Sequence, residues 1–111
     1  MSDLIALSLG TVAHLELVNP PLNLVTPELL AQLDEALATL EATAAGDVRA
    51  VVVSGSGERA FSAGSDVHGF EAQRGPGGRE RLAREEDVTS RLARLPMPTI
   101  AAIEGNALGG G

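Results

Sequence analysis

Two short stretches of this chain have the composition of loops that bring main-chain amides close to a bound molecule. The first is Ala60–Asp66 (Ala-Phe-Ser-Ala-Gly-Ser-Asp), and the second is Glu104–Gly111, which ends in three glycines. Each follows a strand-like apolar run, and its small residues allow a ligand to lie against the backbone. One N–H group from each stretch could donate to the same oxygen atom, and paired amides of this kind stabilise an oxyanion. The pattern therefore predicts an oxyanion-binding site assembled from two loops.

Four apolar segments are expected to form the strands that position these loops. Leu4–Leu9 and Val12–Val18 flank a Gly-Thr turn and are predicted to form a hairpin. Arg49–Ser54 contains a continuous Ala-Val-Val-Val run, which is typical of a strand buried on both faces of a parallel sheet. Thr99–Ile103 is a further short strand, directly before the second loop.

Two helices are predicted between the strands. Thr26 is a capping residue followed by proline and an acid, and an apolar face follows at helical spacing until Gly46 and Asp47 end the element. Arg79–Leu95 is predicted to be a charged helix whose arginine and acid pairs face solvent. The residues of this second helix expected to face inward are Leu82, Leu92 and Leu95.

The remaining segments are expected to be irregular. Gly55–Gly69 is predicted to be a long loop, and Gln73–Gly78 is predicted to be flexible. The resulting order of strands and helices indicates an α/β layer fold. We find no internal repeat and no domain boundary.

Composition excludes several classes of function. The net charge is −7, all eight basic residues are arginine, and phenylalanine is the only aromatic type, so the chain lacks the basic face and stacking aromatics of a nucleic-acid binder. There is no cysteine, and the two histidines lie far apart, so neither a disulfide nor a metal site is expected. The N-terminus is a poor signal peptide and no apolar run reaches the length of a membrane span. We therefore expect a cytoplasmic protein without membrane or nucleic-acid partners.

Each loop alone also fits an ordinary structural explanation. Small residues fill many strand-to-helix turns, so the first loop could be one of them. The three glycines could belong to a flexible tail; if a helix begins there instead, its unpaired N–H groups would point at an anion. A generic nucleotide-binding domain is disfavoured, because the chain has neither the dinucleotide-binding glycine spacing nor a Gly-Lys-Ser/Thr sequence.

Together, the two loops resemble the paired signatures of the enoyl-CoA hydratase/isomerase (crotonase) family. The matching segments are Phe61–Asp66 and Ile103–Gly111, and the agreement extends to Asn19–Asn23 and Pro96–Ala101. The resemblance covers essentially the whole chain. It implies a crotonase-like α/β fold, a ββα-type spiral, of which residues 1–111 would be the N-terminal part of one domain without an internal boundary.

The resemblance also implies roles for individual residues. Members of the family bind an acyl-coenzyme A thioester and hold an enolate-like anion with two backbone N–H groups, which here would be those of Ser65 and Gly110. The segment that follows Ser65 would lie along the coenzyme and ends at His68, where the family often has lysine. The residues implied to bind substrate are Ala63, Ser65, Asp66, Val67, His68 and Gly110, with Arg59 as a candidate phosphate partner.

The implied activity is that of an enoyl-CoA hydratase, a lyase that adds water to a 2,3-enoyl-CoA. Family hydratases activate water with two glutamates that follow the glycine triplet, and the first would lie only a few residues beyond Gly111. The resemblance further implies a trimer or hexamer in fatty acid metabolism, with no cofactor, because coenzyme A is part of the substrate. Two alternatives stay open: an isomerase or another acyl-CoA chemistry of the family, and a non-catalytic, truncated module for acyl-CoA binding or assembly.

Overall fold

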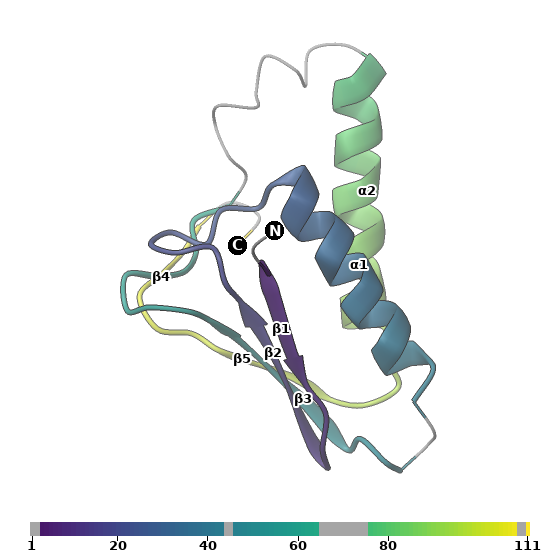
Figure 1. Cartoon of the computed structure of the whole chain (residues 1–111). Coiled ribbons are helices and arrows are strands. Elements are labelled where there is room, and N and C mark those ends of the chain that lie inside the picture. Colours follow the sequence, from purple (N-terminus) through teal and green to yellow (C-terminus); the bar gives the residue numbers. More distant parts are fainter. Residues whose placement is uncertain (1–2, 44–45, 65–75, 109–110) are drawn as a thin grey trace.

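The computed structural model describes residues 3–43, 46–64, 76–108 and 111, in which one sheet carries two helices on the same face (Figure 1). Four strands form this sheet in the order β1 (Ile5–Ser8), β2 (Val12–Leu17), β3 (Ala50–Gly55) and β5 (Thr99–Ala102). Helices α1 (Pro27–Glu41) and α2 (Pro76–Ala93) contact each other. The α/β layer fold predicted from the sequence is confirmed.

The register of the sheet determines which side chains face the helices. Strands β1 and β2 form the predicted antiparallel hairpin, and β2, β3 and β5 run parallel. Leu15 lies opposite Val53 in adjacent strands, and both are buried in the core beneath the helices. The prediction that β3 is buried on both faces is wrong, because Val52 on its other face is only partly buried and no residue of β5 is buried.

Helix α1 begins where its sequence predicts. The Oγ1 atom of Thr26 accepts a hydrogen bond of 3.1 Å from the amide of Leu29, and Pro27 occupies the first helical position. The leucines at helical spacing form the buried face: Leu29, Leu30, Leu33, Leu37 and Leu40. The helix ends at Glu41, before the Gly46–Asp47 pair that was expected to end it.

Helix α2 departs from its predicted form in two ways. It begins at Pro76, so the last part of the segment predicted to be flexible is helical. Val88 is the residue of α2 in the core cluster, whereas Leu82, which was expected to face inward, is 53% exposed. Leu92 packs against the core and Leu95 is buried, as predicted. Among the described side chains of α2, those that pack against the core lie in its C-terminal half.

A second, smaller sheet forms between the two segments that were predicted to be loops. Strand β4 (Ala60–Ser62) pairs in parallel with β6 (Asn106–Ala107), with an irregularity in the register. The prediction of a continuous loop over residues 55–69 is therefore wrong for residues 60–62. This pairing fixes the two candidate site segments relative to each other.

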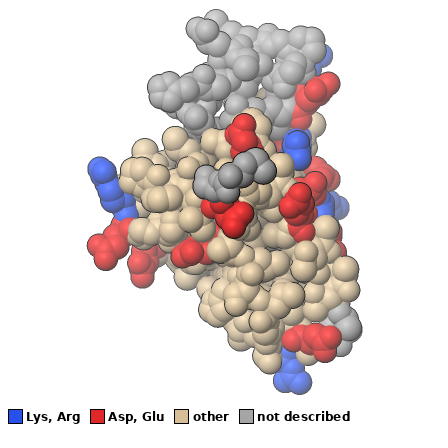
Figure 2. Space-filling model, viewed as in Figure 1, with Lys and Arg blue, Asp and Glu red and all other residues tan. Residues whose placement is uncertain are grey.

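The visible face of the molecule carries acidic side chains scattered among uncharged ones, with arginines mainly at its edges (Figure 2). Within the described part of the chain, neither helix is long and apolar enough to cross a bilayer.

Candidate functional site

Backbone hydrogen bonds join the two candidate loops directly. The amide of Asn106 donates to the carbonyl of Arg59 at 3.3 Å, and the amide of Leu108 donates to the carbonyl of Ser62 at 3.0 Å. Gly111 then folds back, and its amide donates to the carbonyl of Leu108 at 2.8 Å. The structure thus brings together residues 59–62 and 106–108 of the two candidate segments, although they are far apart in the sequence.

Two glycines make this close approach possible. Gly105 has a φ of +75°, and a Cβ atom there would overlap the carbonyl group of Arg59. A Cβ atom at Gly111 would overlap the carbonyl group and the side chain of Ser62. Only glycine satisfies both the left-handed backbone and the crowding at position 105. Gly105 and Gly111 are therefore required for the packing of backbone against backbone.

Asn23 holds the first loop in place through hydrogen bonds separate from those of the second loop. Its side chain is fully buried, and its Nδ2 atom donates to the carbonyls of Ser56 and Ala60 at 3.0 and 2.9 Å. Its Oδ1 atom accepts from the amide of Asn19 at 2.9 Å, and its own carbonyl accepts from the hydroxyl of Ser62 at 2.8 Å. Asn23 has a φ of 49°, a conformation that asparagine adopts more readily than most residues. One side chain thus fixes both ends of the turn between β3 and β4.

Asn23 and the Ser62 hydroxyl are positioning groups that the sequence analysis missed. The amide of Gly64 also donates to the Ser62 hydroxyl, at 3.3 Å, so this serine braces the small residues at the end of the first loop. Asn23 was noted only as part of the family resemblance. The one signal in the sequence was that Asn23 lies two positions after the Pro20-Pro21 pair, which indicates a turn and gives no indication of the partners of Asn23.

A large apolar cavity opens beside the junction of the loops. Its volume is about 870 Å³, and it lies between the sheet, α1 and α2. Ser62 and Gly111 form part of its wall, so the loop junction borders the cavity. The apolar wall residues from the sheet and the helices include Leu15, Leu17, Val53, Leu29, Leu30, Leu33, Leu82 and Leu92. Its polar lining comes mainly from α2, through Arg79, Glu85, Glu86 and Thr89.

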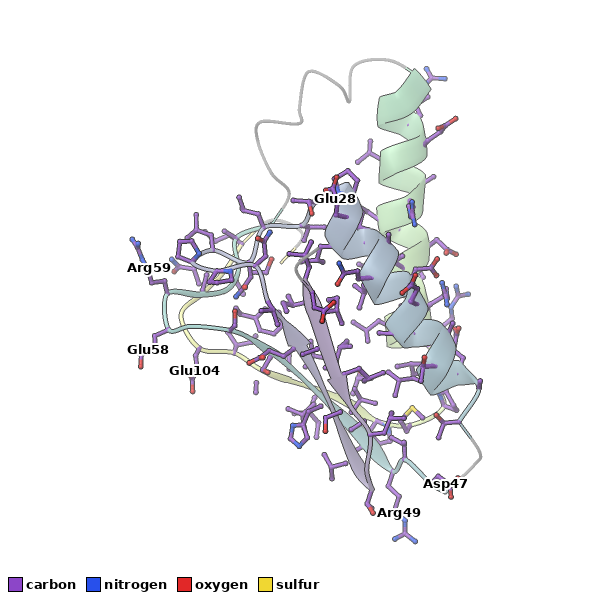
Figure 3. All side chains as sticks on the ribbon, viewed as in Figure 1. Glu28, Asp47, Arg49, Glu58, Arg59 and Glu104 are labelled. Atoms are coloured by element: carbon purple, nitrogen blue, oxygen red, sulfur yellow. The ribbon has the colours of Figure 1, made fainter. Side chains whose placement is uncertain are left out.

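Only two of the predicted site residues are among those described. The amide of Ala63 donates to the carbonyl of Leu22 at 2.9 Å, which places its backbone within the braced end of the first loop. The side chain of Arg59 projects outward, at the same end of the molecule as Glu58 and Glu104 (Figure 3). The predicted residues that lie outside the described part are Ser65, Asp66, Val67, His68 and Gly110. Their roles stay predictions, but the residues next to both predicted donors, Gly64 and Gly111, contact Ser62.

The sequence pattern of the family described as enoyl-CoA hydratase/isomerase matches residues 8–111. The chain belongs to the enoyl-CoA hydratase/isomerase family. The family resemblance inferred from the two loops is therefore confirmed.

Similar proteins agree with the family in sequence and in structure. A "Probable enoyl-CoA hydratase" of Bacillus subtilis is 42% identical over 101 residues, covering 90% of this chain and 38% of the relative. A "Probable enoyl-CoA hydratase" of Mycobacterium tuberculosis is 40% identical over 111 residues, covering 98% of this chain and 42% of the relative. The crystal structure of an enoyl-CoA hydratase from Bacillus anthracis superposes with a TM-score of 0.89 at 29% identity, covering 98% of this chain and 43% of that one.

The crotonase-like fold class is therefore confirmed. The chain spans about two fifths of the length of the hydratase/isomerase relatives that it matches.

Proposed function

We propose that this chain forms the thioester-binding part of an enoyl-CoA hydratase. The observation that carries the proposal is the hydrogen-bonded junction of the two loops, beside an apolar cavity, in a member of the hydratase/isomerase family. The relatives named as probable enoyl-CoA hydratases, at 40% and 42% identity, favour hydration over the other chemistries of the family.

In the proposed reaction, the thioester carbonyl of the substrate lies at the loop junction. Water adds its oxygen to carbon 3 of the enoyl group, and the electrons of the double bond move onto the carbonyl oxygen to give an enolate. The amides of Ser65 and Gly110 would donate to that oxygen, each contributing about 3 kcal/mol of transition-state stabilisation. Protonation of carbon 2 then completes the addition. The glutamates that move these protons in family hydratases would lie outside residues 1–111.

The cavity supports an assignment for the rest of the substrate. Its apolar wall suits the acyl chain, whereas the charged coenzyme would stay outside and run along the first loop. The residues that would contact the coenzyme along this loop are Ala63, Asp66, Val67 and His68. Arg59 would lie near one of its phosphates. The proposed enzyme uses no separate cofactor. We also propose that it is a trimeric or hexameric cytoplasmic enzyme of fatty acid metabolism.

The test compares two substitutions at Ser65 in the complete gene product. Ser65→Pro removes the backbone N–H, whereas Ser65→Ala keeps it and serves as the matched control. With crotonyl-CoA as substrate, we expect Ser65→Pro to lower kcat by about 10²- to 10³-fold and Ser65→Ala to leave it nearly unchanged. Equal losses in both variants would contradict the proposed donor.

Assays of the wild-type protein with a 3-enoyl-CoA as well as crotonyl-CoA separate the alternatives. Conversion of a 3-enoyl-CoA to a 2-enoyl-CoA without hydration would make it an isomerase. Binding of acyl-CoA without any turnover would make it a non-catalytic module. Either result would overturn the hydratase assignment.

A further inference from the structure

Arg91 of α2 forms an ion-pair network that ties this helix to α1. Its Nε and Nη2 atoms donate to the two carboxylate oxygens of Glu41 at 3.2 and 2.7 Å. Its Nη1 atom contacts Asp34, and the carboxylate of Asp87 lies 3.9 Å from the same nitrogen. The Arg91 side chain is only 22% exposed, less than any of its three partners. The charged pairs of this helix were predicted to form a solvent-facing surface; Arg91 instead pairs across the helix contact with Asp34 and Glu41 of α1, whose side chains are 44% and 41% exposed.

The network lies at the end of α2 that is held in place. Val88 is 1% exposed and belongs to the core, and Leu92 packs against the core. Toward the other end of the helix, Leu82 is 53% exposed, and this part of α2 extends past the start of α1 (Figure 1). Helix α2 is therefore anchored near its C-terminus and projects from there.

This anchoring bears on the cavity because α2 is one of its walls. Leu82, Glu86, Thr89 and Leu92 all line the cavity, whereas Arg91 does not. Leu82 and Arg91 are nine positions apart in the helix, which is a distance of about 13 Å along its axis. A rotation of about ten degrees at the anchored end would move Leu82 by about 2 Å, which is more than one methylene of an acyl chain.

We propose that Arg91 is a positioning residue that sets the width of the apolar cavity and, through it, the length of acyl chain that the protein accepts. Its planar guanidinium engages both oxygens of Glu41 while also contacting Asp34, two helical turns away on α1. Contacts at two points along α1 fix the crossing of the helices more firmly than a single pair does. The acyl-chain part of this inference rests on the proposed function, but the control of cavity width does not.

The experiment measures binding of two kinds of ligand to the complete gene product. The first is cis-parinaric acid, a fluorescent fatty acid without coenzyme A, which reports on the cavity alone. The second is a series of saturated acyl-CoA thioesters from butyryl to palmitoyl. The variants are Arg91→Ala and Arg91→Lys, with Arg94→Ala as the matched control, because Arg94 is exposed and its side chain donates to the Ser90 carbonyl within its own turn.

We expect Arg91→Ala to change the dependence of affinity on chain length, by about fourfold for each methylene gained or lost from the cavity. Arg91→Lys should restore part of the wild-type profile, because lysine keeps the charge but not the two-pronged geometry. Arg94→Ala should match the wild type. If Arg91→Ala does not fold, Glu41→Gln weakens the same network while keeping Arg91, and the same change in profile is expected.

The outcomes separate this inference from the proposed function. If the wild type binds cis-parinaric acid, Arg91→Ala changes this binding while Arg94→Ala does not, and no acyl-CoA binds, the proposed function fails and the control of the cavity by Arg91 stands. If Arg91→Ala lowers all affinities by the same factor, or if Arg94→Ala has the same effect, the positioning role is wrong. Absence of cis-parinaric acid binding by the wild type would also overturn it.

Discussion

The amide of Leu108 donates a 3.0 Å hydrogen bond to the carbonyl of Ser62, and this bond couples the two halves of the candidate site. Ser62 also receives support from Asn23 through its hydroxyl, so the junction is braced from both sides. An oxyanion site built from backbone amides depends on this kind of rigidity, because its donors must be in place before charge develops. Substitutions that disturb the junction should therefore affect both stability and binding.

Replacing Gly105 by alanine should destabilise the protein strongly. The new Cβ atom would overlap the Arg59 carbonyl on a backbone with φ +75°, and we expect a loss of about 3 kcal/mol or more. Gly57→Ala is the matched control, since Gly57 has a φ of +79° but open space around it. Urea unfolding of both variants checks this; equal losses would mean that backbone strain alone matters and that the contact with Arg59 does not.

Replacing Asn23 by aspartate should destabilise the protein strongly, although the two side chains are nearly the same size. The Nδ2 donor, which bonds the carbonyls of Ser56 and Ala60, would become an oxygen facing two other oxygens. We expect a loss of about 3 kcal/mol or more, because buried polar groups would be left unsatisfied. Ser56→Ala loses only a 3.3 Å hydrogen bond to Asn23 and should cost about 1 kcal/mol or less. Thermal unfolding that ranked Ser56→Ala as the worse variant would contradict this role for Asn23.

Removing the cap of α1 should have a moderate effect. Thr26→Ala deletes the oxygen that accepts from the Leu29 amide, and we expect a loss of about 1 kcal/mol. Thr26→Ser keeps the hydroxyl and should retain most of the stability. Thr39→Ala is a second control within the same helix, because the Thr39 hydroxyl only bonds the carbonyl of Glu35 on an exposed face. Chemical denaturation should therefore place Thr26→Ala alone clearly below the wild type.

The contribution of Glu41 to stability should depend on pH in the acid range. The hydrogen bonds from Arg91 hold the pKa of Glu41 below its ordinary value of 4.5. A carboxyl whose pKa is lowered by folding stabilises the fold above its unfolded pKa, and this stabilisation disappears as pH falls through the folded pKa.

The difference in urea midpoint between wild type and Glu41→Gln should therefore be constant above about pH 5.5 and should shrink as the solution is acidified below pH 4.5. A difference that grows on acidification would show that the pair with Arg91 does not favour the ionised carboxylate.

Features that depend on neighbours in the sequence were predictable. The cap at Thr26 and the hairpin before it follow from residues within a few positions of each other, and the structure has both. The start of α2 at Pro76 was missed, because the surrounding glycines disfavour a helix when judged locally. The exposure of Leu82 and the ion pairs of Arg91 depend on where α2 lies against α1, which no local pattern specifies.

The candidate site also has features that the local sequence predicts and features that depend on distant residues. The small residues of the two loops signalled close backbone approach, and the glycine at position 105 is required for that reason. The pairing of β4 with β6 was not predicted, because two- and three-residue strands have no detectable alternation and their partners are distant in sequence. Asn23 was missed as the brace of the first loop, since its hydrogen-bond partners Ser56 and Ala60 are more than thirty positions away.

The Leu108–Ser62 bond can form only late in synthesis on the ribosome. Translation proceeds from the N-terminus, so Ser62 and its brace emerge well before the segment that must pair with them. At about 5–20 residues per second, the first half of the site waits for seconds without its partner strand. During that interval the carbonyls of Arg59 and Ser62 are open to solvent or to a chaperone, and ligand recognition can begin only after the later segment has arrived.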